Sequence, residues 1–204
     1  VSKYYLFIYR QKSNVFFSFT KYSPLLHTSC ISASGNPSDV HMKTLTVALS
    51  GCVAVVVHID GNMLHVGSTG DCEAVLGSLS ENDTWVAKKL TTAHNSDNQV
   101  EVDRIVSEHP GEKARDIIKG DRLLGILAPL RAFGDYKFKW PGQQIEEVLG
   151  PPLSRGRKSS TSKQPPAVPP NYKTPPYLTA TPEVTAHRLS PRDKVIDLSE
   201  TLYP

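Results

Sequence analysis

The clearest pattern in the 204-residue sequence is a series of short apolar runs separated by polar turns between residues 45 and 90. Val53–Ile59 is a dense run of β-branched residues, typical of a buried strand, and Asp60–Asn62 has the composition of a hairpin turn. The strands that this pattern predicts are Val53–Ile59, Leu64–Thr69, Cys72–Ser78 and Trp85–Leu90. Because the connections are short, we expect residues 45–79 to form an antiparallel β-meander.

Residues 97–108 change to helical spacing, with Val100 and Ile105 on one face. Asp97 can accept hydrogen bonds from the first turn, and a Pro-Gly pair ends the pattern. Residues 112–119 predict a second, shorter helix.

The composition changes again after residue 150. Nine of the sixteen prolines fall between Pro151 and Pro182, together with a run of serine and basic residues. Such a stretch buries little apolar surface, so we expect an exposed insertion at about residues 150–176. An alternating pattern resumes at Tyr177, and the turn at Ser190–Asp193 predicts another β-hairpin.

Composition and charge exclude several classes of protein. The net charge of +3 is too small to argue for a nucleic-acid partner. No apolar run approaches the roughly 18 residues of a membrane span, so we expect no transmembrane segment. Three widely spaced cysteines without a Cys-x-x-Cys pair favour neither a disulfide framework nor a zinc site, and they fit a reducing compartment. Cys72 has no neighbouring histidine, which argues against a nucleophilic role.

Residues 1–44 differ in composition from the rest of the chain. The first 38 residues contain four basic residues and no Asp or Glu, which is the composition of a transit peptide. A poorly ordered or atypical terminus is the alternative. We therefore expect an atypical or disordered segment at 1–44 and a folded domain at 45–204. Because the sequence starts with valine, we also expect it to be an incomplete copy.

Four short segments occur in a distinctive order. They are Gly70-Asp71 after the first hairpin, Glu101 with Arg104 in the predicted helix, Arg131–Asp135, and Pro182–Val184. On these segments, residues 48–196 resemble the metal-dependent serine/threonine phosphatase family, type 2C. The longer stretches at 131–140 and 169–184 narrow the resemblance to the branch that acts on pyruvate dehydrogenase.

The resemblance implies an α+β fold, a four-layer α-β-β-α sandwich that is incomplete at both ends of this sequence. Two antiparallel sheets would form the middle layers. Residues 45–204 would be a partial phosphatase domain that carries the insertion.

The resemblance also implies a reaction that uses two divalent cations, Mg²⁺ or Mn²⁺, held by carboxylates. A metal-bound water would attack the phosphorus atom of phosphoserine. Most of the family's ligand motifs have no counterpart here, since no Asp-Gly-His-Gly precedes the hairpin and the later aspartates would lie beyond residue 204. Asp71 is the remaining candidate metal ligand, and a turn aspartate bonded to backbone amides is the alternative. We name no catalytic residue and expect this chain alone to be inactive.

Four residues are expected to have structural roles near the site, namely Gly70, Arg131, Gly134 and Asp135. Gly134 lets the backbone turn, while Arg131 and Asp135 can satisfy backbone groups. For Asp135 a structural role is favoured over catalysis. His94 follows an alanine where the family usually has an aspartate, so we expect a loop or core histidine.

Three functions follow from these observations. The first is a phosphatase of the mitochondrial matrix that acts on phosphoserine of the pyruvate dehydrogenase complex, with a possible regulatory subunit. The second is a catalytically dead pseudo-phosphatase that binds a partner, since the main metal aspartates are missing. The third is an adaptor that binds through the proline-rich insertion.

Overall fold

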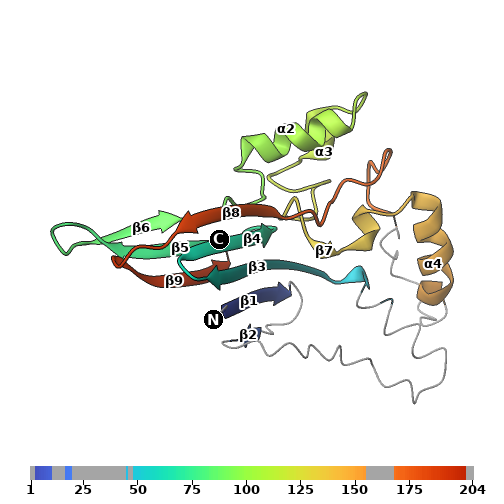
Figure 1. Ribbon diagram of the computed structural model, residues 1–204. Coiled ribbons are helices and arrows are strands. Elements are labelled where there is room, and N and C mark those ends of the chain that lie inside the picture. Colours follow the sequence, from blue (N-terminus) through green and yellow to red (C-terminus); the bar gives the residue numbers. More distant parts are fainter. Residues whose placement is uncertain (1–2, 11–16, 20–44, 46–47, 155–167, 201–204) are drawn as a thin grey trace, which may run out of the picture.

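The computed structural model describes residues 3–10, 17–19, 45, 48–154 and 168–200, and these residues form two antiparallel sheets with short helices (Figure 1). The larger sheet has the strand order β2-β1-β3-β4-β8, and β7 also pairs with β3. Its strands are β1 (Lys3–Arg10), β2 (Phe17–Phe19), β3 (Gly51–Asp60), β4 (Met63–Thr69), β7 (Phe133–Gly134) and β8 (Glu183–Arg188). The smaller sheet has the order β6-β5-β9, with β5 (Cys72–Leu79), β6 (Trp85–Lys89) and β9 (Asp193–Glu200).

The core lies between the two sheets because each contributes one apolar face. In the larger sheet Val57 is opposite Val66, and both side chains are 1% exposed. In the smaller sheet Ala74 and Leu76 of β5 are buried in the same cluster. The residues between these positions point the other way, so Val56 is 39% exposed. The period-2 alternation of the strands therefore produces the inner and outer faces. The α+β fold with two antiparallel layers is confirmed.

The predicted strands exist, but the meander over residues 45–79 is wrong in one respect. β3 and β4 form the expected hairpin, whereas β4 and β5 belong to different sheets. The chain crosses from one sheet to the other at Gly70 and Asp71, directly after β4. A short connection favours antiparallel pairing only when the chain reverses within one sheet.

The hairpin predicted after Tyr177 is wrong for the same reason. β8 pairs with β4 in the larger sheet, and β9 pairs with β5 in the smaller one. The turn at Ser190–Asp193 is present, but it is a second crossing between the sheets.

The helices differ from the prediction in their details. α2 (Gln99–Glu108) is confirmed, but its N-cap is Asn98 rather than Asp97, because the Asn98 side chain accepts a hydrogen bond from the Glu101 amide. The second predicted helix shortens to α3 (Ala114–Ile117), and a single 3₁₀ turn covers Tyr136–Phe138. No helix within the described ranges is long and apolar enough to span a bilayer.

The region predicted as an exposed insertion is partly structured. α4 (Gly142–Ser154) includes the first residues of the predicted insertion. Val168 packs near the start of this helix, since a Cβ atom on Gly142 would lie 3.7 Å from Val168 Cγ1. Residues 155–167 lie outside the described residues. The chain then returns to the core at Tyr177 and Leu178, which are 1% and 3% exposed.

Two strands lie within residues 1–44, and the prediction of an atypical or disordered segment there stays a prediction. β1 pairs with β3 over its whole length, from Lys3 opposite Ile59 to Arg10 opposite Cys52, and β2 pairs with β1. The domain boundary at residue 44 stays a prediction.

Asp193 connects the two sheets beside the second crossing. Its Oδ1 accepts a hydrogen bond from Ser78 Oγ of β5 (2.5 Å). Its Oδ2 accepts one from the Ser190 amide (2.8 Å) and lies 3.3 Å from His187 Nε2 of β8. Burial alone would raise the pKa of Asp193, but the hydrogen bonds from Ser78 and Ser190 outweigh burial and hold the pKa at about 2.

We expect this carboxylate to make folding sensitive to acid. A depressed pKa stabilises the fold above the ordinary value of 3.8, and that contribution is lost as the pH falls towards 2. Urea unfolding of the wild type should therefore weaken between pH 4 and pH 2. An Asp193→Asn variant should be less stable at pH 6 and should lose less stability over that interval. Asp197→Asn, an exposed position on the same strand, is the control. Parallel curves for the wild type and Asp193→Asn would contradict the expectation.

Candidate functional site

The first crossing between the sheets brings together Gly70, Asp71 and the backbone of Arg131. Gly70 has a φ of +97°, a value that side chains rarely allow. A Cβ atom there would lie 2.0 Å from Val53 Cγ1 and 2.9 Å from the carbonyl oxygen of Arg131. Glycine is therefore required, and it sets Asp71 at the start of β5 with only 3% exposure.

His94 fixes the backbone of this crossing from the loop that follows β6. Its amide donates to the Gly70 carbonyl (3.0 Å), and its Nδ1 lies 3.2 Å from the Gly70 nitrogen. Its Nε2 faces Glu183 Oε2 at 3.3 Å. Burial lowers the pKa of His94, and the charge of Arg131 adds to this effect, so the ring is neutral at neutral pH. Its Nδ1 also lies 2.9 Å from the Gly70 carbonyl oxygen, so the tautomer decides which backbone group of Gly70 the ring bonds. His94 is a fully buried loop residue, as expected, and the absence of an acid–base role stays a prediction.

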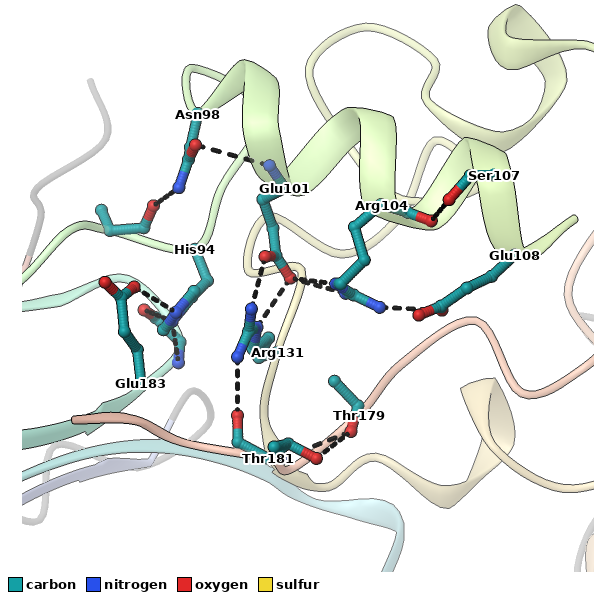
Figure 2. Close-up of polar contacts among 12 residues, drawn as sticks. His94, Asn98, Glu101, Arg104, Ser107, Glu108, Arg131, Thr179, Thr181 and Glu183 are labelled. Carbon is teal, nitrogen blue, oxygen red and sulfur yellow. Dashed lines mark hydrogen bonds and ion pairs between the residues drawn. The ribbon is translucent and has the colours of Figure 1, made fainter.

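Arg131 forms a bidentate ion pair with Glu101 of α2 (Figure 2). Its Nε donates to Glu101 Oε1 and its Nη2 to Oε2, both at 2.7 Å. Its Nη1 donates to the Thr181 carbonyl at 3.0 Å, so Arg131 does satisfy a backbone group as expected. The side chain of Glu101 is only 3% exposed, which makes this pair a buried link between the helix and the segment before β8.

Arg104 completes the network on the surface side. It donates to Glu101 Oε1 through Nε (2.9 Å) and Nη2 (2.5 Å), and to Glu108 through Nη1 (2.8 Å). Burial would raise the pKa of Glu101, but the hydrogen bonds from Arg131 and Arg104 outweigh it and hold the pKa at about 2. Glu101 is therefore a permanent anion between two guanidinium groups, suited to holding structure rather than to moving protons.

The Arg131–Asp135 turn packs against the start of β3. Gly134 has a φ of +65°, and a Cβ there would lie 2.0 Å from the Ser50 carbonyl oxygen. Asp135 follows with a φ of +48° and is 4% exposed. A Cβ on Gly51 would overlap the Asp135 carboxylate, so the acid occupies the space that this glycine leaves. The turn is thus built around close backbone contacts.

Lys139 ties the same turn together from the other side. Its Nζ donates to the Ala132 carbonyl at 2.7 Å. Burial lowers the pKa of Lys139, and the charge of Asp135 opposes that shift. These contacts support the structural interpretation of Asp135, which stays a prediction as far as catalysis is concerned.

Two partners of the site were not predicted from the sequence. Glu101 was paired with Arg104 alone, although Arg131, thirty residues further on, makes the better-buried contact. Glu183 belongs to a recognised segment, but no contact with His94 was expected. No local signal identifies either pair, because each joins residues that only the fold brings together.

A divalent cation does not fit the described residues taken alone. No group of three His, Cys, Asp or Glu side chains among them could hold a metal ion. Asp71 offers one carboxylate at the crossing, while Glu183 faces His94 and Glu101 is bound by two arginines. We derive no chemical step through a metal from these residues.

Comparison with known proteins identifies the family. Residues 11–199 match the model of the family described as protein phosphatase 2C. The chain is 46% identical over 166 residues to the mitochondrial pyruvate dehydrogenase (acetyl-transferring) phosphatase 1 of Bos taurus, covering 81% of this chain and 30% of that protein. It is 47% identical over 156 residues to phosphatase 2 of Homo sapiens, covering 76% and 29%. The mitochondrial phosphatase 1 of Saccharomyces cerevisiae is 36% identical over 164 residues, with coverage of 78% and 27%.

The chain thus spans about 30% of the length of these curated relatives. Among solved structures, the serine-threonine phosphatase 2C from Toxoplasma gondii matches 77% of this chain and 43% of its own, with 17% identity and a TM-score of 0.44. The family model covers nearly the whole chain, and this coverage includes all the described crossings and the Glu101–Arg131 pair. The chain belongs to the protein phosphatase 2C family.

Proposed function

We propose that the protein carrying these residues is a metal-dependent serine/threonine phosphatase that removes phosphate from phosphoserine of pyruvate dehydrogenase. The observation that carries this proposal is the 46% identity over 166 of 204 residues to a protein named for that activity. The relatives in human and yeast have the same named substrate, which supports the narrower branch of the family. Mg²⁺ or Mn²⁺ is the cofactor that the family implies.

Within this function, the described residues form the support of a site rather than a complete one. We propose Asp71 as a metal ligand. It is the acid of the Gly70-Asp71 segment, and it is buried where the chain crosses between the sheets. Gly70 and His94 hold its backbone, and Arg131 fixes the segment before β8 to α2. The other ligands would come from outside the described residues.

The same relatives support a mitochondrial location, since each is named as mitochondrial. We place the protein in the mitochondrial matrix, where its proposed substrate would be found. A regulatory subunit is a further proposal from the family resemblance.

The test is phosphate release from a phosphoserine peptide of pyruvate dehydrogenase, with Mn²⁺ or Mg²⁺ and with a chelator. We expect the protein that contains these residues to be active only with the metal. Asp71→Asn should lower kcat at least tenfold and raise the Mn²⁺ concentration needed for half-maximal rate. Asp197→Asn, an exposed acid on β9, should leave both quantities unchanged.

The possible outcomes separate the two parts of the proposal. If the wild type releases no phosphate with either metal, the phosphatase function is wrong and a binding role replaces it. If the wild type is active and Asp71→Asn has the same metal dependence, Asp71 is a turn aspartate and not a ligand. Circular dichroism of both variants should confirm that they fold.

A further inference from the structure

The segment that follows residue 170 is fastened to the end of α2 by a polar cluster separate from the Glu101–Arg131 pair. The cluster consists of His109, Glu112, Thr174 and Tyr177. His109 caps α2 and is 3% exposed, and the Glu112 amide donates to its carbonyl. The Tyr177 ring stacks on the His109 ring with 4.3 Å between centroids.

Glu112 is the acceptor at the centre of this cluster. Its Oε1 accepts hydrogen bonds from Thr174 Oγ1 and from the Tyr177 hydroxyl (2.7 Å). Its Oε2 is buried and has no hydrogen-bond partner among the described residues. Burial would raise the pKa of Glu112, but the Thr174 and Tyr177 hydrogen bonds outweigh it, so the carboxylate is charged at neutral pH. Two hydroxyl donors therefore stabilise this carboxylate.

Thr174 is the one of these donors that reaches the surface. Its hydroxyl donates to Glu112, so its oxygen can accept from His109 Nδ1 at 2.8 Å. Thr174 is exposed, lies outside any helix or strand, and directly precedes Pro175. A proline directly after a threonine is the sequence that proline-directed protein kinases recognise.

We propose that Thr174 is a phosphorylation site, and that a phosphate there releases residues 171–178 from the His109–Glu112 turn. In the reaction Thr174 Oγ1 bonds to the γ-phosphorus of ATP, the bond from that phosphorus to the β–γ bridging oxygen breaks, and ADP leaves while the hydroxyl proton is lost to solvent. The product has no hydroxyl donor for Glu112. It also carries nearly two negative charges beside that carboxylate, and the repulsion between the two groups opposes the contact.

The release would reach the site through a short stretch of chain. The Lys173 and Thr174 amides donate to the Tyr177 hydroxyl at 2.8 and 3.0 Å. Two residues beyond Tyr177, the Thr179 carbonyl accepts from the Ala132 amide, next to Arg131. Loosening Tyr177 therefore loosens the segment that contacts Arg131, namely residues 177–181.

The experiment treats the wild-type chain with a proline-directed kinase and ATP, locates the phosphate by peptide mass spectrometry, and follows hydrogen–deuterium exchange. We expect phosphate on Thr174 and at least tenfold faster exchange at the amides of Lys173, Thr174 and Tyr177. Thr174→Glu should reproduce the faster exchange, and adding Glu112→Gln should reverse most of it. Thr174→Val, which removes the hydroxyl without adding charge, should have a smaller effect.

Thr181 is the matched control, because it is also exposed and also precedes a proline, while its hydroxyl contacts only Thr179 among the described residues. Thr181→Glu should leave exchange at residues 173–177 unchanged. The proposal is overturned if the kinase modifies Thr181 or Ser190 but never Thr174. It is equally overturned if phosphate on Thr174 leaves the exchange of these amides as it was.

Discussion

Replacement of Glu101 by glutamine is expected to lower the free energy of unfolding by about 3–5 kcal/mol, the usual cost of breaking a buried ion pair by removing one partner. The change leaves the guanidinium groups of Arg131 and Arg104 facing one another without the carboxylate that both contact. The side chain of Arg131 is only 15% exposed, so its positive charge would lose the carboxylate that neutralises it and would gain little water in return. Urea unfolding followed by tryptophan fluorescence measures the effect.

Glu108 supplies the matched control for this prediction. It accepts from the same Arg104 at 2.8 Å, but its side chain is 50% exposed. Glu108→Gln should therefore cost less than about 1 kcal/mol, as exposed ion pairs do. Equal losses for the two variants would mean that burial is not what makes the Glu101 pair important.

Replacement of Gly134 by alanine is expected to cost roughly 3 kcal/mol or more, because it adds a steric clash to an unfavourable backbone conformation. At a φ of +65° the new methyl group would lie 2.0 Å from the Ser50 carbonyl oxygen, a backbone atom that cannot move alone. The pairing of β7 with β3, where Gly134 is opposite Gly51, would have to separate. Thermal and urea unfolding of the variant measure the loss.

Gly61 separates the two contributions to this cost. It has nearly the same φ, +58°, but a Cβ atom there would meet nothing within 4 Å. Gly61→Ala should therefore show only the backbone penalty, about 1 kcal/mol. If Gly134→Ala is no worse than Gly61→Ala, the turn can relax away from Ser50 and the close approach is not a constraint.

The sequence predicts best what is decided locally. The strands at β3 and β4 follow from an apolar run, a turn and a second run, and their hairpin register needs no distant information. Gly70 and Gly134 both take a positive φ, which their residue type permits. The helix α2 is likewise evident, and only the choice between two neighbouring cap residues, Asp97 and Asn98, was wrong.

α4 was missed although signals for it exist. Pro141 precedes it, which is a common start for a helix, and Ile145 is fully buried three residues before Val148. Pro151 and Pro152 favour a loop in the sequence pattern, and this signal outweighed the helical one. They lie in the last turn of the helix, where their missing N–H groups remove two backbone hydrogen bonds and weaken its end.

Sheet membership and the Glu101–Arg131 pair could not be predicted because both depend on long-range packing. A strand carries its alternation in its own residues but not the identity of its neighbour, so β5 and β9 look like members of local hairpins. Several acidic residues in the chain could have paired with Arg131. Only the position of α2 above the segment before β8 selects Glu101 (Figure 2).

The two crossings between the sheets also decide how the chain can fold in time. The β3–β4 and β5–β6 hairpins close over short turns and can form within microseconds. β8 and β9 must wait, because they pair with β4 and β5 across more than a hundred residues, and the short link between them makes each sheet depend on the other. The contacts between residues far apart in the sequence therefore form together in one late step, which makes the folding of the two sheets cooperative. The free-energy cost of closing a loop rises by only about 0.6 kcal/mol for each doubling of its length. The proline-rich stretch can therefore vary in length with little loss of stability.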